Sequence, residues 1–90
     1  MKKTSINEKL KEVAEILVRI VEDTSIPRNI RRAATEAREI LLKEDQSPAI
    51  RASAVIIMLD DMANDPNIPV HARTLVWNIA SELEPIAVEK

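Results

Sequence analysis

A single histidine and a group of three aspartates in this 90-residue chain could support catalysis or metal binding. His71 is the only histidine and could act as a general base, while Asp60, Asp61 and Asp65 could hold a hard cation such as Mg²⁺ or Ca²⁺. The histidine lacks an evident nucleophile, orienting acid or oxyanion-hole loop, and the spacing of the aspartates matches no known cation loop. We therefore predict that the protein is not an enzyme, binds no cofactor or metal, and has no small-molecule substrate.

Three arginines near the start of the second predicted helix form a group with a different chemistry. Arg28, Arg31 and Arg32 could contact the phosphates of a nucleic acid, whose backbone supplies most of the non-specific affinity. However, cations oppose the dipole at a helix N-terminus, and the chain has a net charge of −2 and no aromatic platform for stacking bases. Salt bridges to nearby carboxylates are the simpler interpretation. A small nucleic-acid-associated factor is therefore the alternative function, and nucleic acid is a disfavoured partner.

The only aromatic residue, Trp77, points to protein interaction. On a helical wheel it lies roughly 130° from the core stripe of its helix, on the same side as Val70. A loop or the first helix could cover it, but tryptophan is also enriched at interface hot spots. Ile56 and Ile57 belong to a run that is apolar around the whole helix, so one of them is expected outside the core. We predict that Trp77, Val70, Ile56 and Ile57 form an interface for a second copy of the chain, as in a homodimer, or for another protein.

Prolines at 21-residue intervals mark the helices that position these side chains. Pro27, Pro48 and Pro69 each follow a polar stretch and precede an apolar-periodic run, which is typical of the first turn of a helix. We predict four helices, at about residues 6–22, 27–43, 48–63 and 69–83. Pro85 is expected to end or kink the last helix.

Short polar connections separate these helices. Ser5 and Ser47 are suitable N-caps for the first and third helices. Because connections of four or five residues favour antiparallel neighbours, we predict an all-α four-helix up-and-down bundle made of two helical hairpins. Residues 1–90 are expected to form a single domain.

The absence of glycine excludes whole classes of function. Phosphate-binding loops, dinucleotide fingerprints and nucleophile elbows all require glycine. Left-handed turn positions are therefore expected to fall to residues such as Asn64, Asn67 and Asp45. The longest apolar run, Ala54–Leu59, is too short to cross a bilayer, so a cytoplasmic protein without membrane association is expected.

Charge is distributed unevenly between the two halves of the chain. Residues 1–43 carry ten Lys or Arg and seven Asp or Glu, a net charge of +3, whereas residues 44–90 carry three and eight, a net charge of −5. A modestly dipolar molecule is the simplest interpretation. Opposed patches that steer self-association or a partner are the alternative.

A 42-residue repeat relates the two predicted hairpins. Residues Asp23, Ile26, Pro27, Arg31 and Leu41 recur as Asp65, Ile68, Pro69, Arg73 and Leu83. This Asp…Pro…Arg spacing resembles HEAT-type helical repeats, so a HEAT-like pair of hairpins is the alternative fold. Two hairpins are fewer than the roughly three repeats that such arrays need for stability, which favours the closed bundle.

The whole chain resembles a small archaeal family, uncharacterised protein family 0147, and two segments carry this resemblance. They are DTSIPRNIRRAA at residues 23–34 and NIPVHAR at residues 67–73. The resemblance implies a compact four-helix bundle and an archaeal, cytoplasmic origin. It implies no function and no catalytic residue.

Overall fold

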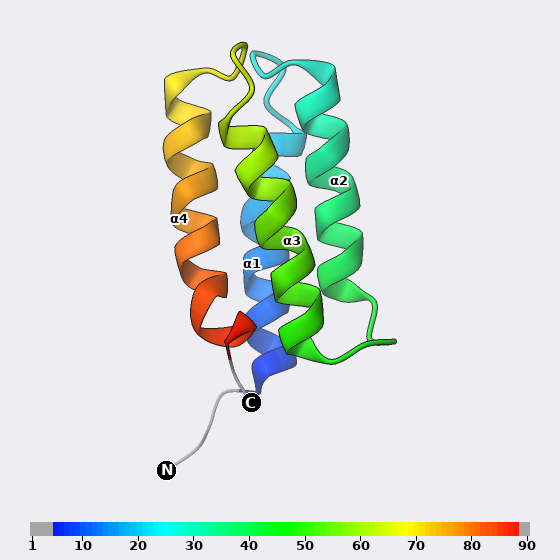
Figure 1. Ribbon diagram of the computed structural model, residues 1–90. Helices are drawn as coiled ribbons and strands as arrows, with labels where there is room; N and C mark the ends of the chain where they lie inside the picture. Colours follow the sequence, from blue (N-terminus) through cyan, green and yellow to red (C-terminus); the bar gives the residue numbers. More distant parts are fainter. Residues whose placement is uncertain (1–4, 89–90) are drawn as a thin grey trace.

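The computed structural model describes residues 5–88 as four α-helices. They are α1 Ile6–Val21, α2 Arg28–Leu42, α3 Pro48–Ala63 and α4 Val70–Ala87. Successive helices run antiparallel, and α1 also packs against α4, which closes the bundle (Figure 1). The prediction of an all-α four-helix bundle made of two hairpins is therefore confirmed, and its closure distinguishes it from an open HEAT-like stack.

The helices pair unequally within the bundle. The contacts of α1 with α2, and of α3 with α4, are much more extensive than those between α2 and α3. The core is one cluster with apolar residues from every helix, including Leu17, Ile30, Leu59 and Ile79. Among the described helices, none is long and apolar enough to cross a membrane.

Serine caps begin α1 and α3 as expected. The Ser5 hydroxyl oxygen accepts hydrogen bonds from the N–H groups of Asn7 and Glu8, at 3.2 and 3.4 Å. The Ser47 hydroxyl oxygen accepts one from the Ile50 N–H at 3.3 Å. These bonds satisfy backbone donors that have no partner inside the first helical turn.

The other two helices begin one residue later than predicted. Pro27 and Pro69 are the N-caps of α2 and α4, with extended backbone at ψ 149° and 151°, and not their first residues. Only Pro48 lies in the first turn, at the start of α3. Since proline carries no side-chain acceptor, the N-termini of α2 and α4 have no side-chain cap of their own.

The prediction of left-handed turns is wrong, and of the two alternatives predicted for Pro85, an end or a kink of the helix, the end is wrong. None of residues 5–88 has a positive φ, and the C-cap Asn64 is right-handed with φ −88°. The chain thus reverses without any conformation that favours glycine, which explains how it folds with none. Helix α4 continues through Pro85 to Ala87 and buries Ile86, although proline supplies no N–H for the helical hydrogen bond.

Candidate functional site

Arginines near the starts of α2 and α4 donate hydrogen bonds to backbone carbonyls that precede these helices. Arg31 Nε donates to the carbonyl of Ile26 at 2.9 Å, within the α1–α2 loop. Arg73 Nε donates to the carbonyl of Ala63, the last residue of α3, at 3.1 Å. The carbonyls at the end of a helix, such as that of Ala63, have no partner inside the helix, and those of a loop, such as that of Ile26, also need donors; the two arginines therefore stabilise the reversals of the chain.

Arg51 performs this role in the interior of the protein. Its side chain is only 2% exposed. It donates to the carbonyls of Gln46 at 3.0 Å and Leu41 at 2.8 Å, and to the side-chain oxygen of Asn7. One residue thus joins the end of α2, the α2–α3 loop and the start of α1. Sequence reasoning missed this role, although Arg51 follows Pro48 by three residues, much as Arg31 and Arg73 follow Pro27 and Pro69 by four.

These contacts reduce the number of arginines on α2 that could bind a nucleic acid. Arg31 is half-buried and bound to the backbone, whereas Arg28 and Arg32 are exposed. The nucleic-acid alternative therefore rests on two exposed guanidinium groups of one helix. It remains a prediction, and salt-dependent retention of RNA or DNA in a filter-binding assay is its test.

Asp23 and His71 link the two hairpins at the loop end of the bundle. His71 Nε2 donates to Asp23 Oδ2 at 2.8 Å, because an ionised carboxylate can only accept. Asp23 Oδ1 accepts from the N–H and the hydroxyl of Ser25, at 2.9 and 2.6 Å. The predicted general-base candidate is thus bonded to a carboxylate of the α1–α2 loop.

An equivalent bond lies at the position related by the 42-residue repeat. Asn29 Nδ2 donates to Asp65 Oδ2 at 3.1 Å, and Asp65 Oδ1 accepts from the Asn67 N–H at 2.8 Å. Each loop aspartate thereby reaches the first turn of the opposite hairpin's second helix, where no side-chain cap exists and a negative charge is favourable. The repeat is therefore a structural one. Within residues 5–88, no three His, Asp or Glu side chains gather as metal ligands.

Protonation of Asp23 is expected to weaken this link between the hairpins. Hydrogen bonds from the Ser25 hydroxyl, His71 and the Ser25 N–H lower the pKa of Asp23 from 3.8 to about 2. Because the folded pKa is below the unfolded value, the stabilisation is present above pH 3.8 and is lost as the pH falls toward 2. Carbon-13 NMR of the carboxyl should give a midpoint near 2 in the wild type and a higher midpoint in Ser25→Ala.

Asp23→Asn provides the control for this pH dependence. Its urea midpoint should change less than that of the wild type between pH 3.8 and 2, since the titrating group is gone. An Asp23 carboxyl that titrates near 3.8 in the wild type contradicts the prediction.

The predicted interface residues are unequally exposed. The side chains of Trp77, Ile57 and Val70 are 56%, 65% and 75% exposed. Ile56 is half-buried and packs against the core. Of the predicted interface residues, Trp77, Ile57 and Val70 are therefore exposed, and we call these three the outer face.

Two observations place the outer face on the α3–α4 hairpin. Arg73 reaches the end of α3, and Trp77 lies four residues later, one turn along the same flank of α4. Ile57 and Trp77 each lie about two turns from the α3–α4 loop, and the two helices are antiparallel neighbours (Figure 1). Trp77 and Ile57 are therefore at the same level of the bundle, with Val70 two turns toward the loop.

Known proteins resemble this chain over nearly its whole length. Residues 1–86 match the Uncharacterised protein family (UPF0147). A UPF0147 protein of Methanothermobacter thermautotrophicus is 61% identical over 80 residues, which cover 89% of this chain and 78% of that protein. A UPF0147 protein of Methanocaldococcus jannaschii is 51% identical over 77 residues, which cover 86% and 83%.

Solved structures agree with the fold. The crystal structure of the unknown function protein MMP1188 is 49% identical with a TM-score of 0.88, and the match covers 96% of this chain and 98% of that one. A crystal structure from family UPF0147 of Thermoplasma acidophilum is 38% identical with a TM-score of 0.82, over 90% and 96% of the two chains. Both matches cover at least 90% of this chain.

Proposed function

The chain belongs to the archaeal uncharacterised protein family UPF0147, and we propose that it is a non-catalytic assembly module of the cytoplasm that self-associates through its outer face. The observation that carries this proposal is the exposure of Trp77 and Ile57 at the same level of two neighbouring helices. The only aromatic side chain of the chain is in contact with solvent, although the core would offer a more favourable environment.

The charge pattern around Trp77 supports an interface. Along the exposed side of α4, Val70, Thr74, Trp77 and Ser81 follow one another at helical spacing and none is charged, while the charged Arg73 and Glu84 flank this stripe, four residues before and seven residues after Trp77. Charged residues make up 31% of the whole chain. Depletion of charge with an aromatic anchor at the centre is typical of the core of a protein interface.

In a dimer with two-fold symmetry, the Trp77 and Ile57 side chains of both copies would contribute to the interface. In an isologous dimer, the Trp77 of one copy and that of its partner lie in the same buried patch. Burying a large apolar side chain contributes about 1.5–3 kcal/mol, so a pair of tryptophans and isoleucines offers enough favourable energy to offset part of the cost of association.

Sedimentation equilibrium over a wide concentration range tests the proposal. We expect the wild type to form a dimer, and Trp77→Ala to weaken the dimer at least about 30-fold while the helical circular dichroism is kept. Trp77 fluorescence should shift to shorter wavelength as the dimer forms, and no other aromatic residue contributes to the signal.

Leu42→Ala is the matched control, because Leu42 is an exposed leucine on α2, outside the outer face. Its dimer should be as stable as that of the wild type. A wild-type chain that stays monomeric at all concentrations, or a dimer that Trp77→Ala leaves unchanged, overturns the proposal.

A further inference from the structure

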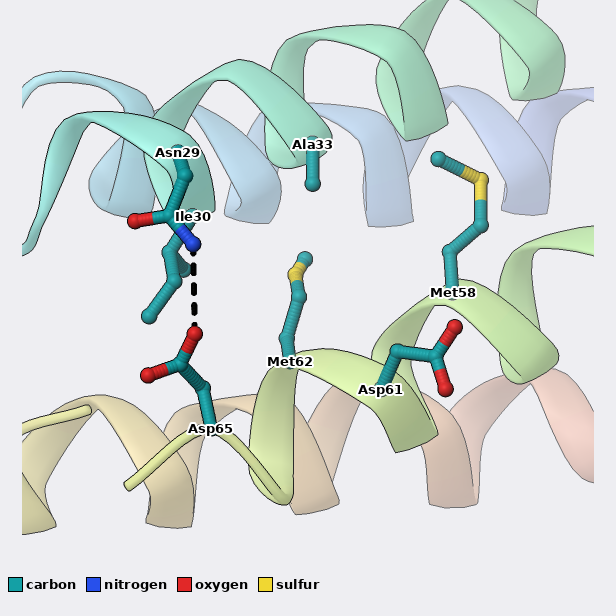
Figure 2. Close-up of a pocket in the computed structure, with 7 residues that line it drawn as sticks. All are labelled: Asn29, Ile30, Ala33, Met58, Asp61, Met62 and Asp65. Carbon is teal, nitrogen blue, oxygen red and sulfur yellow. Dashed lines mark hydrogen bonds between the residues drawn. The ribbon is translucent and has the colours of Figure 1, made fainter. Parts of the chain in front are cut away.

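A groove of about 230 Å³ lies between α2 and α3, and none of the outer-face residues lines it (Figure 2). Its apolar lining comes from Ile30 and Ala33 of α2 and from Met58 and Met62 of α3. The two methionine side chains point from α3 toward α2, and the bond between Asn29 and Asp65 crosses one end of the groove.

The groove exists because small and long side chains face each other across a loose contact. The α2–α3 contact is much less extensive than those inside the hairpins, and Ala33 leaves space opposite Met58 and Met62. Methionine is flexible and polarisable, so it can repack around an inserted apolar group. A cavity of about 150 Å³ already admits benzene, so this groove has room for a large apolar side chain.

The charge of the lining restricts the occupant. Asp61 and Asp65 are the only charged residues that line the groove, and both come from the acidic half of the chain. Asp61 is exposed, whereas Asp65 is half-buried and bonded to Asn29. An apolar floor beside two carboxylates is complementary to an apolar side chain with a cation next to it.

We infer that this groove binds a basic amphipathic helix of a partner protein, which inserts one apolar side chain between Met58 and Met62 and places a Lys or Arg beside Asp61. A helix in a groove between two helices is a recurrent mode of recognition, with anchors on one face of the incoming helix. This site goes beyond the self-association proposed above, because its lining contains none of the outer-face residues and it binds a different partner.

Methyl NMR of the full chain tests this site directly. The chain contains three methionines, so methyl-labelled protein gives three signals, with Met1 as an internal reference for Met58 and Met62. The probe is a synthetic amphipathic helix of about 14 residues built from Leu and Lys. We expect saturable shifts of the Met58 and Met62 signals with this peptide, and none with the same peptide carrying Glu in place of Lys.

Two matched pairs of variants separate the groove from other surfaces. Ala33→Leu fills the groove and should abolish binding, whereas Thr35→Leu adds the same side chain on an exposed side of α2 and should not. Asp61→Lys should weaken binding roughly five- to tenfold, and Asp60→Lys, the neighbouring exposed residue that does not line the groove, should leave it unchanged.

Three results would overturn the inference. The first is equal binding of the Lys and Glu peptides. The second is unchanged binding by a folded Ala33→Leu variant. The third is a shift of the Met58 and Met62 signals with protein concentration that persists in Trp77→Ala, which would mean that a second copy fills the groove. A wild-type chain that is monomeric in the centrifuge leaves this test intact, so failure of the proposed self-association is distinguishable from failure of this site.

Discussion

Arg51→Ala is expected to destabilise the bundle by about 3–4 kcal/mol. Arg51 is almost fully buried and donates to Leu41, Gln46 and Asn7. A hydrogen bond from a charged group contributes about 1.5–3 kcal/mol, and its loss leaves the carbonyl at the end of α2 without a partner. A domain of this size is stabilised by roughly 5–13 kcal/mol in total, so the change removes a large fraction of the stability.

Urea denaturation followed by circular dichroism measures this effect. Arg51→Lys keeps the charge but not the planar fork that reaches several acceptors, so we expect an intermediate loss of about 1–2 kcal/mol. Arg32→Ala removes an exposed arginine and should change the free energy of unfolding by less than about 0.5 kcal/mol. Equal effects of Arg51→Ala and Arg32→Ala would show that Arg51 does not have the role described.

Leu59→Ala is expected to destabilise the protein by about 2–5 kcal/mol, whereas Ile57→Ala should change the stability by less than about 0.5 kcal/mol. Both residues lie in the most apolar part of α3, but Leu59 is fully buried and Ile57 is 65% exposed. Truncating Leu59 removes buried apolar surface and leaves a cavity. Truncating Ile57 removes a side chain that the core does not use.

The effects of the two substitutions on self-association should have the opposite order, with Ile57→Ala the more damaging. Ile57→Ala is expected to weaken the dimer, since Ile57 belongs to the outer face. Unfolding in dilute solution and sedimentation equilibrium of both variants give the two free energies separately. If Ile57→Ala lowers the stability of the dilute protein as much as Leu59→Ala does, Ile57 is a core residue and the outer face is wrongly defined.

Local signals along the chain were enough to predict the helices and their antiparallel order. Ser5 and Ser47 cap α1 and α3 through bonds that span only two or three residues. The repeated Pro27 and Pro69 place two further helix starts to within one residue, because the restriction that proline places on φ is local. Such short-range interactions depend little on the rest of the fold.

Part of the candidate site was also visible in the sequence. The helical wheel places Trp77 off the core stripe of α4, and the structure exposes it. The helical wheel could not decide which of Ile56 and Ile57 is exposed, because a helix that is apolar around its whole circumference has no distinct core-facing side. The position of α4 beside α3 decides that Ile56 packs against the core and Ile57 does not.

Only the tertiary structure shows which residues that are distant in the sequence form hydrogen bonds with each other. Asp23 meets His71, and Arg51 meets Asn7, across separations of 48 and 44 residues. The groove beside Met58 likewise depends on how far apart the packing of the two hairpins holds α2 and α3. Helix starts and apolar periodicity arise from interactions within a few residues, so the sequence determines them directly. Which charged group meets which, and where a space remains, depends on the placement of whole helices.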